Sequence, residues 1–229
     1  MAGVMAKLGK DRSYQFIASV MLACLISLAL LAGRIFSSDS LRYIFLVWNL
    51  VLAVIPLLVA WWLSERLKTL SWFGWPQVVL SILYLGFLPN TFYLITDFVH
   101  LRPTDDVGLY FDVVLLAGFM LNGIVLGFGS VYLIHKQLLR RLNAHTALGI
   151  IAVVFFLASF ATYLGRFTRF NTWDILLRPA GLLFDVSDRL VNPTQHSDTY
   201  LATLTLFLVL FSGYLVVYTY SRLITLKKN

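Results

Sequence analysis

Apolar runs long enough to cross a membrane recur along this chain from end to end, and no other feature limits its fold as strongly. A hydrocarbon core about 30 Å thick takes about 20 apolar residues of helix. Six such runs occupy residues 14–36, 41–64, 75–101, 110–134, 146–165 and 199–221. Because 59% of the residues are hydrophobic and only 13% are charged, no segment is left for a soluble domain. The sequence predicts an all-α integral membrane bundle of about six transmembrane helices, a single domain over residues 1–229.

The distribution of charge predicts the orientation of these helices. The net charge of +7 is gathered in alternate loops, which indicates membrane topology and not nucleic-acid binding. If the N-terminus is cytoplasmic, that side receives eleven basic and two acidic residues, and the outer side receives seven basic and nine acidic residues. An odd number of helices would break this positive-inside pattern. We expect both termini in the cytoplasm and the lipid bilayer as partner, with no nucleic acid bound.

The first apolar run has an alternative interpretation as a cleaved signal peptide, because Lys7, Lys10 and Arg12 precede it. The run is long, however, and no small-x-small cleavage site follows it, so we expect a retained helix. Cys24 is the only cysteine of the chain and falls in the middle of this run. The sequence therefore excludes disulfides within the chain and thiolate metal clusters.

The third apolar run ends in the polar stretch FLPNTFYLITDFVHL, residues 87–101. Pro89 removes a backbone hydrogen bond and should break this helix. Beyond the break, spacings of i, i+3, i+7 and i+10 place one set of polar residues on a single helical face: Asn90, Tyr93, Asp97 and His100. An ionisable side chain near the centre of a membrane helix costs on the order of 3 kcal/mol, and less toward the interface. The stripe should therefore face the bundle or a wet cavity.

A second polar segment, GRFTRFNTWD, follows the fifth apolar run on the same predicted side of the membrane. It contains Arg166 and Arg169, and then Asn171 and Asp174, each pair three residues apart. Arginine on the outer side often pairs with a carboxylate or binds an anion through its planar fork of donors. We expect Asp97 to pair with one of these arginines, and the two polar segments to line one pocket at the outer interface.

The rest of the segment 166–198 is too apolar for a solvated linker. Leu182, Leu183, Val186 and Leu190 fall on one helical face, which predicts an amphipathic interfacial helix between helices five and six, closed by a turn at Asn192-Pro193. We expect this segment to fold over the outer face as a lid.

In the fourth apolar run, Gly123 and Gly127 form a G-x-x-x-G ridge, which predicts close helix packing and offers a surface for oligomerisation. Asn122 beside it is expected to form an interhelical hydrogen bond. His135 and His145 are expected at headgroup level, in a short basic stretch that meets anionic headgroups.

The two polar motifs, FLPNTFYLITDFVHL and GRFTRFNTWDILLRP, resemble the bacterial multi-pass membrane family catalogued as domain of unknown function 1361. The resemblance covers nearly the whole chain. The matching positions are Pro89, Asn90, Tyr93, Thr96, Asp97, Arg166, Arg169, Asn171, Trp173 and Asp174. What the resemblance implies is a multi-pass protein of a bacterial cell (plasma) membrane, with no activity to carry over.

Three functions fit the polar cluster. In the first, it clasps the helices of a structural or scaffold subunit. In the second, it binds a lipid or other anionic headgroup, with or without chemistry. Asp97 and His100 would then move protons or ligate a metal, and the ligand would be held by Asn90, Tyr93, Asp112, Arg166, Arg169, Asn171 and Asp174. In the third, the break at Pro89 belongs to a small-solute or ion transporter.

Catalysis stays an open question at this stage, because the chain has no Gly-rich phosphate loop, nucleophile elbow or H-E-x-x-H motif. Asp97 and His100 supply two metal ligands where three or four are needed, so Asp112 and Asp174 are the candidates for the others. The sequence does not identify a cofactor.

Overall fold

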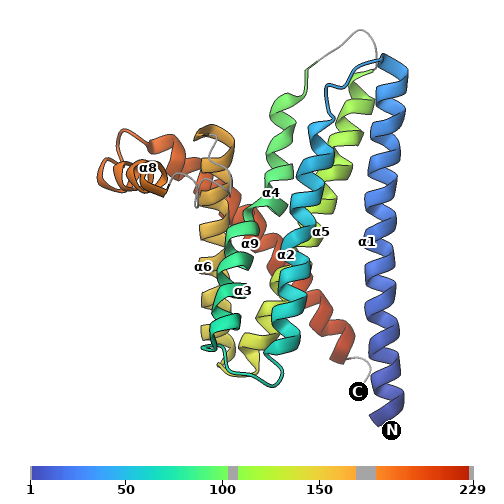
Figure 1. Cartoon of the computed structure of the whole chain (residues 1–229), viewed down its shortest axis with the longest axis vertical. Coiled ribbons are helices and arrows are strands. Elements are labelled where there is room, and N and C mark those ends of the chain that lie inside the picture. The colour runs from blue at the N-terminus through green and yellow to red at the C-terminus, as the bar shows by residue number, and fades with distance from the viewer. Residues whose placement is uncertain (1, 103–107, 169–178, 227–229) are drawn as a thin grey trace.

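The computed structural model describes residues 2–102, 108–168 and 179–226, and these ranges are almost entirely helical, with no strand among them (Figure 1). Six helices are long and apolar enough to cross a membrane: Gln15–Ser38, Phe45–Arg66, Trp75–His100, Leu109–Leu139, Ala144–Thr168 and Ser197–Leu223. The predicted all-α bundle with six membrane-spanning helices is confirmed, and the chain is a multi-pass membrane protein.

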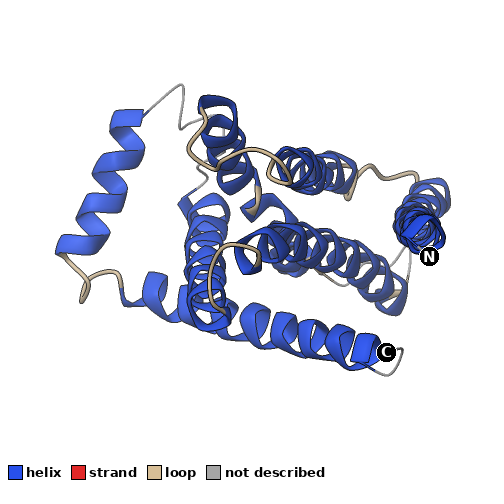
Figure 2. Ribbon diagram, turned by 90° about the horizontal axis from the view of Figure 1, so that it is seen from below, coloured by secondary structure: helices blue, strands red, loops and turns tan. Residues whose placement is uncertain are grey.

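The long helices are α1 (Ala2–Ser38), α2 (Phe45–Arg66), α5 (Leu109–Leu139), α6 (Ala144–Tyr163) and α9 (Ser197–Leu226). Helix α5 is central, because it packs against α1, α2, α4 and α6. Helix α9 packs along α6, and α1 lies at the opposite edge of the bundle (Figure 2). Both termini lie at the same end of the bundle (Figure 1).

The third span is broken where Pro89 was expected to break it. It consists of α3 (Trp75–Phe87), α4 (Pro89–Thr96) and the 3₁₀ turn η1 (Asp97–His100). Leu88 between the helices donates its N–H to the carbonyl of Tyr84 at 2.9 Å. Polar side chains then support the backbone at the break. The Asn90 amide donates to the carbonyl oxygen of Phe87 at 3.0 Å, and the Thr162 hydroxyl donates to the carbonyl oxygen of Pro89 at 3.3 Å. This support is how membrane helices tolerate proline.

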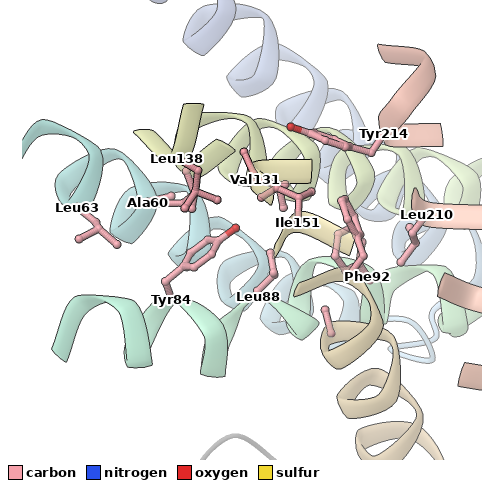
Figure 3. Close-up of a cluster of buried hydrophobic side chains, with 14 of the residues drawn as sticks. Ala60, Leu63, Tyr84, Leu88, Phe92, Val131, Leu138, Ile151, Leu210 and Tyr214 are labelled. Atoms are coloured by element: carbon pink, nitrogen blue, oxygen red, sulfur yellow. The ribbon is translucent and has the colours of Figure 1, made fainter. Parts of the chain in front are cut away.

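Two buried apolar clusters hold the bundle together. The larger one joins α2, α3, α4, α5, α6 and α9 (Figure 3). Phe92, Phe155 and Tyr214 are among its largest side chains. The second joins α1, α2, α4 and α5 around Leu46, Leu115 and Phe119. Many of the remaining apolar side chains face outward, as expected for a surface in contact with lipid.

The glycine ridge of α5 packs against α4 of the same chain. A Cβ atom on Gly123 would lie 2.2 Å from the backbone oxygen of Thr91, and one on Gly127 would lie 2.6 Å from the ring of Phe92. Both glycines are buried, so the ridge offers no open surface to a second copy. Asn122 forms the expected clasp, because its amide donates to the Ser27 hydroxyl on α1 at 2.9 Å.

Two expectations about the ends of the bundle need correction. Helix α8 (Pro179–Val191) is the amphipathic helix that was predicted, and it ends at the expected turn. It lies at the edge of the bundle opposite α1, and not as the predicted lid over the end of the bundle away from the termini (Figures 1 and 2). His135 is buried instead of lying at headgroup level, because α5 continues past it to Leu139. The His135 ring packs against α9, and its Nδ1 lies 2.8 Å from the hydroxyl of Tyr214.

Candidate functional site

Arg166 is the centre of a buried polar cluster at the end of the bundle away from the termini. It lies in η2 (Leu164–Thr168), a π-helical turn that continues α6. Such turns widen the helix by one residue and change the direction of its side chains. The side chain of Arg166 reaches α4 and η1, where the break after α3 has turned the polar stripe toward the bundle.

All three guanidinium nitrogens of Arg166 have partners in this cluster. Nε donates to Thr96 Oγ1 at 2.7 Å, one terminal nitrogen lies 2.9 Å from His100 Nε2, and the other donates to Asp97 Oδ1. The guanidinium carbon also lies 4.0 Å from the ring centroid of Tyr93, close enough for a cation–π interaction. Arg166 is thus fixed from four directions.

Asp97 is 1% exposed, and both of its carboxylate oxygens accept hydrogen bonds. Oδ1 accepts from Arg166, and Oδ2 accepts from the amide of Asn49 on α2 at 3.0 Å. A buried carboxylate without such partners would be strongly destabilising. The cluster therefore fastens three spans to one another: the second through Asn49, the third through Asp97 and the fifth through Arg166.

The contact with Arg166 decides the protonation of His100. A guanidinium has no acceptor, so His100 Nε2 must be the acceptor of this hydrogen bond. The imidazole is then neutral and carries its proton on Nδ1. In this arrangement Nε2 is occupied and cannot act as a base or a metal ligand. Within the part of the chain that the structure describes, no three His, Cys, Asp or Glu side chains come together in a metal-binding group.

A second buried ion pair lies at the same end of the bundle. Arg34 Nε on α1 donates to Asp112 Oδ1 on α5 at 2.7 Å, and the Tyr43 hydroxyl donates to Asp112 Oδ2 at 3.1 Å. The side chains of the ion pair are 1% and 0% exposed. Burial, and then the neighbouring charge of Asp112, raises the pKa of Tyr43, so this phenol stays a donor.

Two further arginines lie around His100 at the surface. Arg42 lies with its guanidinium carbon 5.4 Å from the ring centroid of Tyr43 and one nitrogen 3.4 Å from the His100 carbonyl. Arg102 is exposed. Both are close enough to act electrostatically on His100, as Arg166 does. Among the described residues neither Arg42 nor Arg102 forms an ion pair.

The candidate residues from the sequence thus fall into four groups. Tyr93, Asp97 and His100 are brought together with Arg166. Asn90 supports the helix break, and Asp112 belongs to the second ion pair with Arg34. Arg169, Asn171 and Asp174 lie outside the described residues.

Four participants were missed by sequence reasoning: Asn49, Arg34, Arg42 and Tyr43. Asn49 and Arg34 had a usable signal, because each is a strongly polar residue inside an apolar run.

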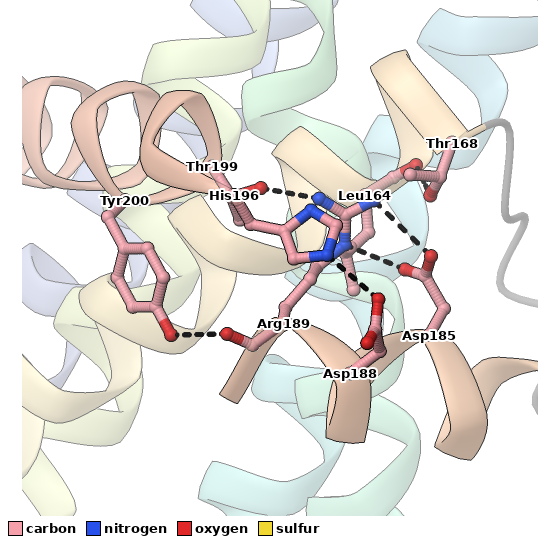
Figure 4. A network of polar contacts seen from close by, with 8 residues as sticks. All are labelled: Leu164, Thr168, Asp185, Asp188, Arg189, His196, Thr199 and Tyr200. Atoms are coloured by element: carbon pink, nitrogen blue, oxygen red, sulfur yellow. Dashed lines mark hydrogen bonds and ion pairs between the residues drawn. The ribbon is translucent and has the colours of Figure 1, made fainter. Parts of the chain in front are cut away.

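A third polar network joins α8 to the start of α9 (Figure 4). Arg189 donates to the Asp185 carboxylate at 2.8 Å and to the Thr199 hydroxyl, and its carbonyl accepts from the Tyr200 hydroxyl. Hydrogen bonds from His196 and Asn192, which lie in the turn after α8, lower the pKa of Asp188. These contacts hold α8 at the side of the bundle, and none of them reaches the Arg166 cluster.

Comparison with known protein families gives a match over most of the chain. A family model described as "Protein of unknown function (DUF1361)" matches residues 48–213, which is well over half of the chain and includes both polar motifs. No curated protein and no solved structure matches the chain.

Proposed function

The chain belongs to the family described as "Protein of unknown function (DUF1361)", and because that description gives no activity, we propose from the geometry that the outer cluster binds an anionic headgroup. The ligand would present a phosphate or carboxylate to Arg42, Arg102 and His100. The observation that carries the proposal is an excess of positive charge. Three arginines surround His100, and the only acid in their described contacts is Asp97.

The arrangement of these arginines suits an anion. The planar fork of a guanidinium matches the oxygens of a phosphate or carboxylate and forms charge-assisted hydrogen bonds with them. Arg166 is already fixed by Asp97, Thr96 and His100, so it contributes a positive field more than free donors. Among the described residues Arg42 and Arg102 retain donors without a partner, and they lie nearer the surface, where a headgroup would arrive.

The proposed membrane and orientation follow from the charges of the two ends. With both termini in the cytoplasm of a bacterial cell, the basic loops face the inner side of the plasma membrane, as the positive-inside rule requires. The Arg166 cluster then lies at the extracytoplasmic interface, and its arginines are an exception on the less basic side. A bound anion would neutralise part of the positive charge of these arginines.

A structural role for the cluster is the second candidate, and it too rests on a specific observation. Every guanidinium nitrogen of Arg166 is used within the chain, and Asp97 is buried beneath it. In this alternative the cluster only clasps three spans, and no ligand is needed. The two candidates differ in what Arg42 and Arg102 do, since neither residue takes part in the clasp.

Photoactivatable phosphatidylglycerol in bilayers of phosphatidylcholine separates the two. We expect the label in peptides that contain residues 98–102 and 42. The double variant Arg42→Gln/Arg102→Gln should lose it roughly 25-fold, because each basic residue near a membrane surface contributes about 1 kcal/mol. Arg222→Gln, an exposed arginine at the opposite end, is the matched control and should keep full labelling.

The clasp alone predicts a different result. Labelling of residues 98–102 would then be absent, or the same in wild type and in the double variant. Asp97→Asn and Arg166→Gln should each lower the stability of the protein by about 3–5 kcal/mol in either case, because each leaves an unpaired buried partner. Stability therefore tests the clasp, and labelling tests the ligand.

A further inference from the structure

The opposite end of the bundle carries a pocket that the outer cluster does not involve. It lies where the residues that directly follow α2 meet those that directly follow α5, close to the end that holds both termini. Leu67, Lys68, Arg140 and Arg141 line it, and its volume is about 210 Å³. A water molecule takes about 30 Å³ in the liquid, so the space is large enough for a solvated phosphate group.

The pocket has a rigid cationic wall. Arg141 donates to the carbonyl oxygens of Leu67 at 2.6 Å and Leu70 at 2.9 Å, and its guanidinium carbon lies 5.6 Å from the ring centroid of Trp72. These contacts close the end of α2 and fix Arg141 in place, so little side-chain entropy is left to lose on binding.

Arg140 and Lys68 add mobile charge beside this wall. Arg140 uses one nitrogen on the side-chain oxygen of Gln137 at 3.3 Å, which leaves most of its five donors for a ligand. Lys68 contacts Glu65, and both side chains are nearly half exposed. Three positive charges thus line or approach the pocket against one negative charge in contact with them.

The surroundings of the pocket indicate a lipid. The loop from α2 to α3 carries an apolar rim that no other part of the described chain covers: Leu70 is 46% exposed, Phe73 is 92% exposed and Trp75 is 78% exposed. Aromatic residues of this kind occupy the membrane–water interface, with their rings at the level of the headgroups. A ligand bound at Arg140 would therefore lie beside the acyl region of the bilayer and not in free solution.

We propose that this pocket is a binding site for the phosphate of an anionic phospholipid in the leaflet on the side of the termini. Arg141 and Arg140 bind the phosphate oxygens, and Lys68 supplies the charge that favours a net negative headgroup over a zwitterionic one. Phe73 and Trp75 hold the glycerol and the start of the acyl chains. The site is independent of the outer cluster, so either can exist without the other.

The same photoactivatable phosphatidylglycerol tests this site, because peptide mapping separates it from the outer one. We expect a second label in peptides covering residues 67–75 and 140–142. Lys68→Gln/Arg140→Gln should reduce that label about 25-fold, since each basic residue near the surface changes binding about fivefold. Lys136→Gln is the matched control, because Lys136 is exposed at the same end but does not line the pocket, and it should change the label less than about twofold.

Four results would overturn the proposal. The first is no label in these peptides, and the second is an equal loss from Lys136→Gln, which would show a diffuse attraction to the membrane surface. The third is equal labelling by a phosphatidylcholine analogue, which would remove the preference for a net negative charge. The fourth is complete displacement of the label by millimolar inorganic phosphate, which would make free phosphate the ligand. Lys68 and Arg140 are exposed, so an unchanged unfolding midpoint shows that the variants fold.

Discussion

Several charged residues at the end of this bundle away from the termini are almost completely buried. Arg34 and Asp112 are almost completely inaccessible, and the two terminal nitrogens of Arg34 have no hydrogen-bond partner among the described residues. Burying such a pair costs desolvation free energy that the attraction between the charges only partly offsets. The pair is therefore better understood as a constraint on how α1 meets α5 than as a large source of stability.

Removing one member of this pair should be worse than removing both. Arg34→Met or Asp112→Leu alone should lower the free energy of unfolding by about 3–5 kcal/mol, because the remaining charge stays buried without a partner. The double variant should lose less than either single variant. The unfolding midpoints in mixed micelles with increasing sodium dodecyl sulfate give all three values, and additive losses would contradict this account.

At the scale of single residues, the sequence predicted a polar face correctly where its residues lie close together in one helix. The polar face from Asp97 to His100 follows from helical periodicity alone. Arg166 was an expected partner of Asp97, because the sequence predicts both on the same side of the membrane. The role of Asn49 could not be predicted, because a lone amide in an apolar helix has no preferred direction until the neighbouring spans are placed. The Arg34 pair depends in the same way on α1 lying beside α5.

Among the helices, α4 and α5 approach each other closely along the glycine ridge. This contact requires glycine at position 123, because the backbone oxygen of Thr91 occupies the space that a side chain would need. The broken third span makes this approach easier, since α4 is short and can tilt independently of α3. The break and the glycine ridge are therefore two parts of one packing arrangement.

Gly123→Ala should destabilise the protein by about 1–3 kcal/mol, because α4 must move away from α5 to admit the methyl group. Gly149→Ala on α6 is the matched control: no atom beyond its chain neighbours and the backbone of its own helix lies within 4 Å of its Cβ position, and alanine is the better helix former. The same unfolding measurement should show a loss for the first variant and no loss for the second. Equal behaviour would mean that α4 does not pack tightly on the ridge.

Element types were predicted more accurately than element positions. Apolar runs identify spans because the bilayer fixes their length, and the amphipathic pattern identified α8. The location of α8 could not be predicted, since it depends on the hydrogen bonds that Arg189 forms with Thr199 and Tyr200 at the start of α9. The continuation of α5 to Leu139 was missed because its last turns are basic, although their inner face is buried.

The whole molecule has two chemically different ends, and this asymmetry gives a topology that can be measured. In a Cys24→Ser background, Thr194→Cys lies in the exposed turn between α8 and α9, and Thr69→Cys lies in the exposed loop after α2. A membrane-impermeant maleimide added to intact cells should label the first and not the second. Labelling of position 69 from outside would reverse the proposed orientation and place the Arg166 cluster on the cytoplasmic side.

The distance in sequence between Asp97 and Arg166 has a consequence for biosynthesis. The carboxylate leaves the ribosome 69 residues before the guanidinium that neutralises it. During that interval Asp97 lacks the arginine that forms its ion pair, while Asn49, which donates to its other carboxylate oxygen, has already been synthesised. We therefore expect this part of the third span to reach its final depth once the fifth span has been translated, so that the helices of this bundle do not all settle in the order of synthesis.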